Sequence, residues 1–209
     1  CNECAACRGI LDGSVLDVTE IDAASNNGVD NIRDLRDETR YTPAQVRKRV
    51  FIIDEVHMLS IGAFNALLKT LEEPPAHVLF ILATTELHKV PATILSRCQR
   101  FDFRRIGAED ISRRLLDVAA GEGIALTEGA ARLIARLADG AMRDALSMLD
   151  RAAAAGAVDE KTVTAALGVM GQDDGIRLAE HLKTGDLAAA VGLLDEYYNA
   201  GRDLASVYD

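Results

Sequence analysis

The stretch Val50-Phe51-Ile52-Ile53-Asp54-Glu55-Val56-His57 decides the fold class of this chain. Four apolar residues lead directly into two adjacent carboxylates, and a short apolar run of this kind predicts a strand that is buried on both faces of a parallel sheet. Ligands of such sheets bind beyond the carboxyl ends of the strands, so Asp54 and Glu55 are expected at a ligand site. Taken by itself, the stretch is explained equally well by a strand that ends in a solvated acidic turn.

The two carboxylates suit the chemistry of a nucleoside triphosphate. Mg²⁺ prefers oxygen ligands, so Asp54 is predicted to hold a Mg²⁺–phosphate complex. Glu55 is predicted to orient and deprotonate an attacking water. The stretch therefore has the arrangement of a Walker B motif.

The residues that follow predict a second strand beside the first. Ser60 is suited to cap a helix with an apolar stripe at Phe64, Leu67, Leu68 and Leu71. Val78 to Leu82 then predicts a strand that ends in Ala83-Thr84-Thr85. Strand, helix, strand with short links is a βαβ unit, so the strands are expected to be parallel. Thr85 is then placed to hydrogen-bond the γ-phosphate or the attacking water, although an ordinary strand-end hydroxyl explains it more simply.

The remaining segments predict an α/β part followed by helices alone. Before the acidic strand, Val15 to Ile21 alternates as a strand does, and Val29 to Arg40 predicts a surface helix with Asn27 as its cap. After Phe103 the strand signal disappears. Helices are predicted at 108–120, after a Thr127 cap, at 142–155, at 160–167 with an Asp159 cap, at 176–183, and at 187–200 with an Asp186 cap.

Six motifs occur in order along the chain: Glu20 to Ser25, Ile53 to Ser60, Phe64 to Pro75, Ala83 to Thr85, Ser96-Arg97-Cys98, and Arg143 to Leu146. In this order and spacing they resemble the gamma/tau subunits of the bacterial DNA polymerase III clamp loader, which are AAA+ ATPases. The resemblance covers essentially the whole chain and weakens after about Gly168. It implies a partial AAA+ α/β core with a parallel sheet over 1–105, an all-helical lid domain over 106–168, and the start of a helical collar or oligomerisation domain over 169–209.

The resemblance also implies roles for two arginines. Arg97, in Ser-Arg-Cys, matches an arginine finger that reaches the ATP of the neighbouring subunit. The paired N–H donors of its planar guanidinium group suit phosphate oxygens. Arg143 matches the family's second sensor, which touches the γ-phosphate. Without the resemblance, Arg97 is explained by an interface or intramolecular salt bridge and Arg143 by a surface charge pair.

A phosphate-binding loop of the form Gly-x-x-x-x-Gly-Lys-Ser/Thr does not occur in the 209 residues. In the resembled family this loop lies upstream of the position at which the chain begins. We therefore expect a fragment that lacks its N-terminal part and does not hydrolyse ATP alone.

Cys1, Cys4 and Cys7 form a C-x₂-C-x₂-C cluster, and such spacing suggests a metal site in an intracellular protein. Structural Zn²⁺ takes four ligands. The resemblance implies a fourth cysteine slightly upstream, so that 1–7 would be a structural zinc knob. An iron–sulfur site and free thiols remain as alternatives. Cys98 is expected to pack in the core.

The composition excludes some function classes. A hydrophobic content of 49% can build a core, and a net charge of −10 argues against a surface that coats DNA by bulk charge. The sequence shows neither a membrane-length apolar run nor a signal peptide, so a cytoplasmic location is expected.

The resemblance implies an ATP-driven motor subunit of the DNA polymerase III holoenzyme, which loads the sliding clamp onto primed DNA with ATP and Mg²⁺. The implied partners are the delta and delta-prime subunits, further gamma/tau copies, the sliding clamp and primer–template DNA, in a hetero-oligomeric ring. Two alternatives remain: an ATPase-inactive, delta-prime-like subunit of the same assembly, and a zinc-binding interaction module without nucleotide chemistry.

Overall fold

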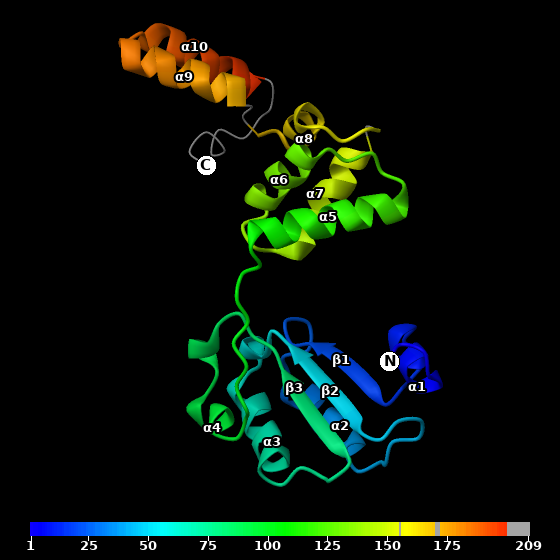
Figure 1. Ribbon diagram of the computed structural model, residues 1–209. Helices are drawn as coiled ribbons and strands as arrows, with labels where there is room; N and C mark the ends of the chain where they lie inside the picture. The colour runs from blue at the N-terminus through cyan, green and yellow to red at the C-terminus, as the bar shows by residue number, and fades with distance from the viewer. Residues whose placement is uncertain (155, 170–171, 200–209) are drawn as a thin grey trace. The chain divides into compact units, whose positions relative to one another are not determined.

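A computed structural model describes residues 1–154, 156–169 and 172–199 of the chain. The chain divides into two compact units, Cys1–Asp102 and Phe103–Asp209 (Figure 1). The first unit contains a parallel sheet with helices and the second contains helices, as the sequence predicts. The finer division into 1–105, 106–168 and 169–209 stays a prediction.

The first unit is built around a three-stranded sheet. Its strands are β1 (Val18–Asp22), β2 (Arg49–Asp54) and β3 (Val78–Leu82). They are parallel and lie in the order β1-β2-β3. The helices of this unit are α1 (Ala5–Leu11), α2 (Val29–Glu38), α3 (Ile61–Glu72) and α4 (Ala92–Leu95), and two short 3-10 turns are η1 (Val56–Met58) and η2 (Leu87–Lys89).

The predicted βαβ unit is confirmed. The Ser60 hydroxyl accepts a hydrogen bond from the Ala63 backbone N–H at 3.2 Å, which satisfies one of the unpaired amides at the start of α3. β3 has the predicted bounds and pairs with β2 from Arg49↔Val78 to Ile53↔Leu82. The carboxyl ends of the two strands therefore meet at one edge of the sheet.

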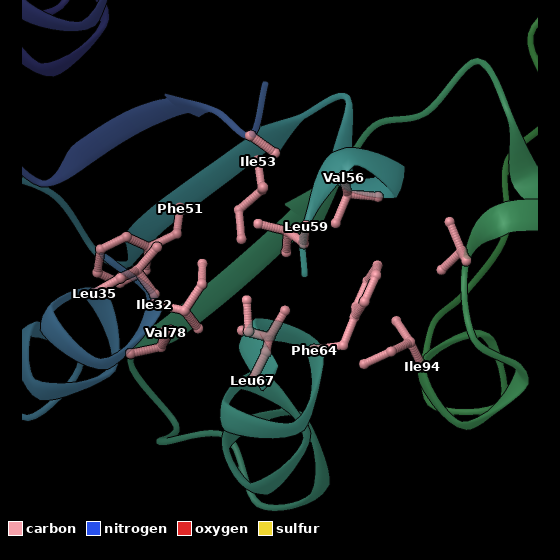
Figure 2. Packing of buried hydrophobic residues seen from close by; sticks show 13 residues of the cluster. Ile32, Leu35, Phe51, Ile53, Val56, Leu59, Phe64, Leu67, Val78 and Ile94 are labelled. Atoms are coloured by element: carbon pink, nitrogen blue, oxygen red, sulfur yellow. The ribbon is translucent and has the colours of Figure 1, made fainter. Parts of the chain in front are cut away.

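The core of this unit lies between the sheet and two helices. Phe51 and Ile53 of β2 are fully buried against Ile32 of α2 and Leu67 of α3, so both helices cover the same sheet face (Figure 2). The predicted burial of β2 on both faces is wrong for the described residues: Ile52 is only half-buried, and on β3 Leu79 and Ile81 are 49% and 45% exposed. The reason is that the described helices that pack on the sheet lie on one side of it.

Two upstream expectations also need correction. β1 begins at Val18 rather than at Val15, because residues 15–18 form a turn in which the Val18 N–H donates to the Val15 carbonyl at 3.4 Å. The buried carboxylate of Asp17 in this turn accepts hydrogen bonds from the backbone at 44–46. α2 is capped by Gly28 without a side-chain bond, not by Asn27. The Asn27 carbonyl instead accepts from the Ser60 N–H at 3.1 Å, which ties the start of α2 to the start of α3.

The second unit contains α5 (Ala108–Glu122), α6 (Glu128–Leu137), α7 (Met142–Ala153), α8 (Glu160–Leu167), α9 (Gln172–Thr184) and α10 (Leu187–Asn199). The predicted caps Thr127, Asp159 and Asp186 each accept from a backbone N–H of the first helical turn. The helices α5 to α8 share one core, whereas α9 and α10 pair around a smaller apolar cluster.

The boundaries of the helices differ slightly from those expected. α9 begins at Gln172, earlier than the predicted 176. The predicted helix ends at 155 and 200 lie outside the described residues. None of the helices in the described part of the chain is both long enough and apolar enough to cross a bilayer.

Candidate active site at the carboxyl edge of the sheet

Three carboxylates gather where β1 and β2 end. Asp22 of β1 lies opposite Asp54 of β2 in the strand register, and Glu55 follows Asp54 directly. The Ala23 N–H donates to the Asp54 carbonyl at 3.0 Å, so this pairing continues to the end of the strands. Parallel pairing alone places these side chains at one edge, where ligands of such sheets bind.

The backbone turns sharply at Glu55. This residue has φ +46° and ψ +44°, a left-handed conformation that costs a residue with a Cβ about 1–2 kcal/mol. The turn continues into η1, and the buried Val56 anchors it by donating its N–H to the Ala83 carbonyl at 2.9 Å. The backbone strain is therefore held in place by β3 and aims the Glu55 side chain toward the end of β3.

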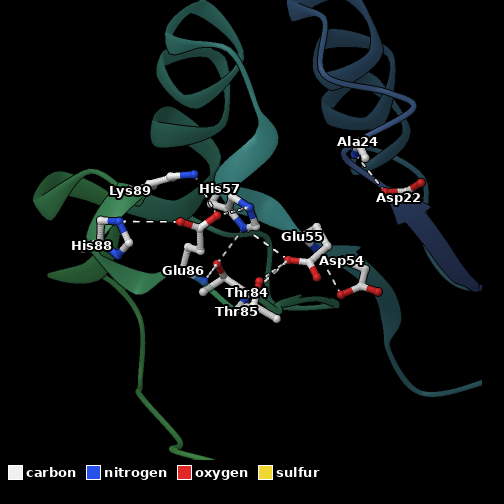
Figure 3. Close-up of polar contacts among 10 residues, drawn as sticks. All are labelled: Asp22, Ala24, Asp54, Glu55, His57, Thr84, Thr85, Glu86, His88 and Lys89. Carbon is white, nitrogen blue, oxygen red and sulfur yellow. Dashed lines mark hydrogen bonds and ion pairs between the residues drawn. The ribbon is translucent and has the colours of Figure 1, made fainter. Parts of the chain in front are cut away.

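Thr85 meets Glu55 there, as the sequence predicts for two adjacent strand ends. The Thr85 hydroxyl donates to Glu55 Oε2 at 3.0 Å, and the Thr85 backbone N–H approaches the same oxygen at 3.4 Å (Figure 3). A carboxylate oxygen that accepts such bonds is restricted in its rotation. The geometry suits a group that must keep one orientation toward a reacting water.

A further set of residues at this edge was not singled out by the sequence. Figure 3 shows the imidazole of His57 between Glu55, Thr84 and Glu86. Glu86 also pairs with Lys89 at 2.7 Å, and this hydrogen bond lowers the pKa of the Glu86 carboxyl, with a smaller contribution from the His57 charge. The only sequence signal for these residues is their closeness to Glu55 and Thr85 along the chain.

Asp54 fits the predicted Mg²⁺ chemistry by its donor type. Its side chain is half-buried, and its Oδ1 accepts from the Glu55 N–H at 2.9 Å. This bond fixes the carboxylate at the sheet edge. Oxygen ligands of this kind are what Mg²⁺ takes in nucleotide sites, together with several waters and the phosphates.

The two predicted arginines come from the turn after α4 and from α7 rather than from the strand ends. Arg97 follows α4, and its guanidinium donates to Glu72 Oε1 and to the Thr93 carbonyl, each at 2.7 Å. These contacts are intramolecular, and none of the contacts seen for Arg97 is with Asp54, Glu55 or Thr85. Arg143 is exposed in the first turn of α7, in the second unit. The roles predicted for both arginines stay predictions.

The three N-terminal thiols lie close together. The sulfurs of Cys1, Cys4 and Cys7 are within 4.8 Å of one another, and the Cys1 and Cys7 sulfurs are 3.7 Å apart. Tetrahedral Zn²⁺ with bonds of about 2.3 Å would place two sulfurs about 3.8 Å apart. The backbone N–H of Asn2 and the Cys4 side chain lower the pKa of the Cys7 thiol, which favours the thiolate that a metal binds. The donors present therefore fit three of the four ligands of a zinc site.

Cys98 is a different kind of thiol. It is half-buried against the core of the first unit, as expected, and burial raises the pKa of its thiol. A protonated thiol in such a place is an inert core residue rather than a ligand.

Two family models match the chain. Residues 1–107 match a model described as DNA polymerase III, delta subunit, and residues 110–158 match one described as DNA polymerase III clamp loader subunit, ATPase lid domain. DNA polymerase III subunit tau of Bacillus subtilis is 53% identical over all of this chain, and the tau subunit of Escherichia coli is 46% identical over 94% of it. The chain spans 38% and 31% of the length of these two relatives.

Solved structures agree on the fold. A Thermotoga maritima RuvB Holliday junction branch migration motor aligns with a TM-score of 0.61 at 15% identity, over 84% of this chain and 65% of that one. A RuvB variant, T158V, from the same organism aligns with a TM-score of 0.62. A parallel sheet with two carboxylates at its carboxyl edge, a following helical unit and these matches lead to one conclusion: the chain belongs to the AAA+ family of DNA polymerase III clamp-loader subunits, among its gamma/tau members.

Proposed function

We propose that the chain is part of an ATP-driven motor subunit of the clamp loader of bacterial DNA polymerase III, which loads the sliding clamp onto primed DNA. The observation that carries this proposal is the pair Asp54–Glu55 at the end of β2, with Glu55 held by Thr85 of the neighbouring strand end. In an interaction module without nucleotide chemistry, nothing would require the left-handed backbone at Glu55 that directs its carboxylate toward Thr85.

Each residue has a distinct part in the proposed hydrolysis. Asp54 would hold Mg²⁺, which neutralises charge on the phosphates when it is bound. Glu55 accepts a proton from the water that attacks the γ-phosphorus. The Thr85 hydroxyl keeps the Glu55 carboxylate in the orientation that this proton transfer needs. Arg143 senses the γ-phosphate in the same subunit, and Arg97 acts on the ATP of a neighbour.

The assembly that we propose is a hetero-oligomeric ring in the cytoplasm. Its members are further gamma/tau copies, delta and delta-prime, and it acts on the sliding clamp and primer–template DNA. The 209 residues contain no Gly-x-x-x-x-Gly-Lys-Ser/Thr loop and span about a third of the tau relatives. We therefore assign the phosphate-binding loop to a part of the protein outside these residues and expect the chain alone not to hydrolyse ATP.

Replacing Glu55 with glutamine in the full-length protein tests this function. The amide keeps the shape of the side chain but cannot take a proton, so the ATP turnover number should fall about 10²- to 10⁴-fold while ATP binding stays close to normal. Glu73→Gln is a matched control, because Glu73 is an exposed residue at the end of α3. It should keep full turnover.

Two results would count against the proposal. Near-normal turnover in Glu55→Gln would remove Glu55 as the base. If the full-length wild-type protein neither bound nor hydrolysed ATP, the subunit would be of the ATPase-inactive, delta-prime-like kind, an alternative that the delta-subunit model matching residues 1–107 keeps open.

A further inference from the structure

His57 occupies a central position at the candidate active site, yet the hydrolysis described above assigns it nothing. Its side chain is only 7% exposed. Nδ1 lies 3.2 Å from Glu55 Oε2 and 3.0 Å from Thr84 Oγ1, and Nε2 lies 3.4 Å from Glu86 Oε1 (Figure 3). The ring therefore joins the carboxylate of Glu55 to the segment that follows β3.

The chain geometry makes this contact possible. The left-handed residue Glu55 leads directly into the 3-10 turn η1, and in this turn His57 Nδ1 comes within 3.2 Å of Glu55 Oε2. The turn is closed by the Met58 N–H, which donates to the Glu55 carbonyl at 2.8 Å.

The ring is held at both of its nitrogens. Nδ1 hydrogen-bonds to Thr84 Oγ1 at 3.0 Å, and the carboxylates of Glu55 and Glu86 lie within ion-pair distance of Nδ1 and Nε2. Glu86 is itself held by Lys89 at 2.7 Å, and the Glu86 N–H donates to Thr84 Oγ1 at 3.0 Å. The far side of the ring is thus anchored to a segment that is already fixed.

We propose that His57 is a positioning residue for ATP hydrolysis, which ties the Glu55 carboxylate to the strand-end segment Thr84–Glu86. The inference rests on the proposed function and deepens it. Thr85 and His57 contact the same carboxylate oxygen, Oε2, so together they hold Oε2 and leave Oε1 to receive the proton of the attacking water. Among the hydrogen bonds and ion pairs of the described residues, loss of His57 leaves Thr85 as the remaining partner of the Glu55 carboxylate, which can then rotate.

Two near-isosteric variants test the contacts at Nδ1 and Nε2 separately. In His57→Asn the amide nitrogen overlays Nδ1, so the donor to Glu55 is kept and the contact to Glu86 is lost. In His57→Gln the amide overlays Nε2, so the Glu86 contact is kept and the donor to Glu55 is lost. His57→Phe retains a buried ring without either contact. All three would be made in the full-length protein, with ATP turnover, KM for ATP and ATP affinity measured for each.

We expect the turnover number to fall about 10- to 100-fold in His57→Phe and His57→Gln, as for a catalytic group that loses its alignment, with KM for ATP and ATP affinity unchanged. His57→Asn should keep the turnover within about threefold of the wild type, because the alignment is retained. The matched control is His88→Asn: His88 is 76% exposed and reaches the same Glu86 carboxylate at 3.6 Å. It should behave as the wild type.

A double variant tests whether His57 acts through Glu55. In a Glu55→Gln background, His57→Phe should have almost no further effect on turnover, because two residues that act as a unit are not additive. Three results would each overturn the positioning role. These are an equal loss of turnover in His57→Asn and His57→Gln, a loss of ATP affinity that accompanies the loss of turnover, and fully additive losses of turnover in the double variant. A wild-type protein without ATPase activity would instead refute the proposed function itself.

Discussion

Replacing Asp17 with asparagine should destabilise the first unit by about 1–2 kcal/mol at neutral pH, although Asp17 lies outside the candidate active site. The Asp17 side chain is 5% exposed and accepts N–H hydrogen bonds from three successive residues, at 3.0 Å from Ala44, 2.7 Å from Gln45 and 3.3 Å from Val46. These three bonds share Oδ2. Asparagine can place its oxygen where Oδ2 lies now, but its NH₂ group then replaces Oδ1, which accepts from the Ala44 N–H at 3.1 Å, and the negative charge that strengthens all of these bonds is lost.

The magnitude follows from the number and type of these bonds. A hydrogen bond to a charged group contributes about 1.5–3 kcal/mol, and removing an acceptor leaves its donors unpaired. Ala44 and Gln45 are exposed, so water can replace part of the loss. The expected cost is therefore nearer to that of one charged hydrogen bond than of three. For a unit of this size, 1 kcal/mol corresponds to a shift of roughly 4–8 °C in Tm.

The effect should depend on pH in a defined direction. The Gln45 N–H is the largest cause that lowers the pKa of Asp17, while burial opposes it. Because the folded pKa lies below the unfolded value of about 3.9, the carboxylate contributes stability that is present above pH ~4 and is lost as the pH falls through the folded pKa. The free energies of unfolding of the wild type and of Asp17→Asn should therefore differ by the full amount at pH 7 and become equal as the pH falls below ~4.

Urea unfolding of the chain, followed by circular dichroism at several pH values, measures this difference. Asp30→Asn is the control, because Asp30 pairs with Arg33 on the surface of α2 and is 81% exposed. It should leave the unfolding midpoint unchanged. An Asp17→Asn protein as stable as the wild type at pH 7, or a stability difference that grows in acid, would refute the reasoning.

Three further predictions concern the candidate sites. Glu55→Gly should be more stable than Glu55→Ala by about 1 kcal/mol in urea unfolding, because glycine relieves the left-handed backbone; the usual order, alanine above glycine, would show that the strain is absent. Rings of full-length Arg97→Ala chains should lose ATP turnover while each chain still binds ATP, because an arginine finger contributes about 10³-fold or more. Mixing them with Glu55→Gln chains should restore activity at interfaces where an intact Glu55 faces an intact Arg97, and no recovery in confirmed mixed rings would mean that Arg97 does not act in trans. The full-length protein should contain about one Zn²⁺ per chain and this chain should bind it weakly; Cys4→Ser should abolish the metal and Cys98→Ser should not, and elemental analysis that finds iron or no metal would reject the zinc knob.

The βαβ unit was predictable because its signals are local. An apolar run, a capping serine and helical spacing each act within a few residues, and they place β3, α3 and the pair Asp54–Glu55 correctly. The meeting of Glu55 and Thr85 was predictable as well, because parallel strands end at the same edge. The start of β1 was not, because residues 15–18 form a turn that the alternating pattern does not report, and the Asp17 carboxylate in this turn pairs with amides 27 to 29 residues away.

The sequence by itself determined the fold class, the family and the acidic pair, because apolar spacing and short motifs involve residues that are close together along the chain. Only the tertiary structure decided that Glu55 sits in a left-handed turn, that one face of the sheet is covered among the described residues, and that His57 reaches Glu55, Thr84 and Glu86 at once. These features depend on where the end of β3 lies relative to η1. That position is set by the packing of Phe51 and Ile53 of β2 with Leu67 of α3. Such contacts are stabilised by the burial of apolar surface in the folded chain, so a local sequence pattern does not reveal them.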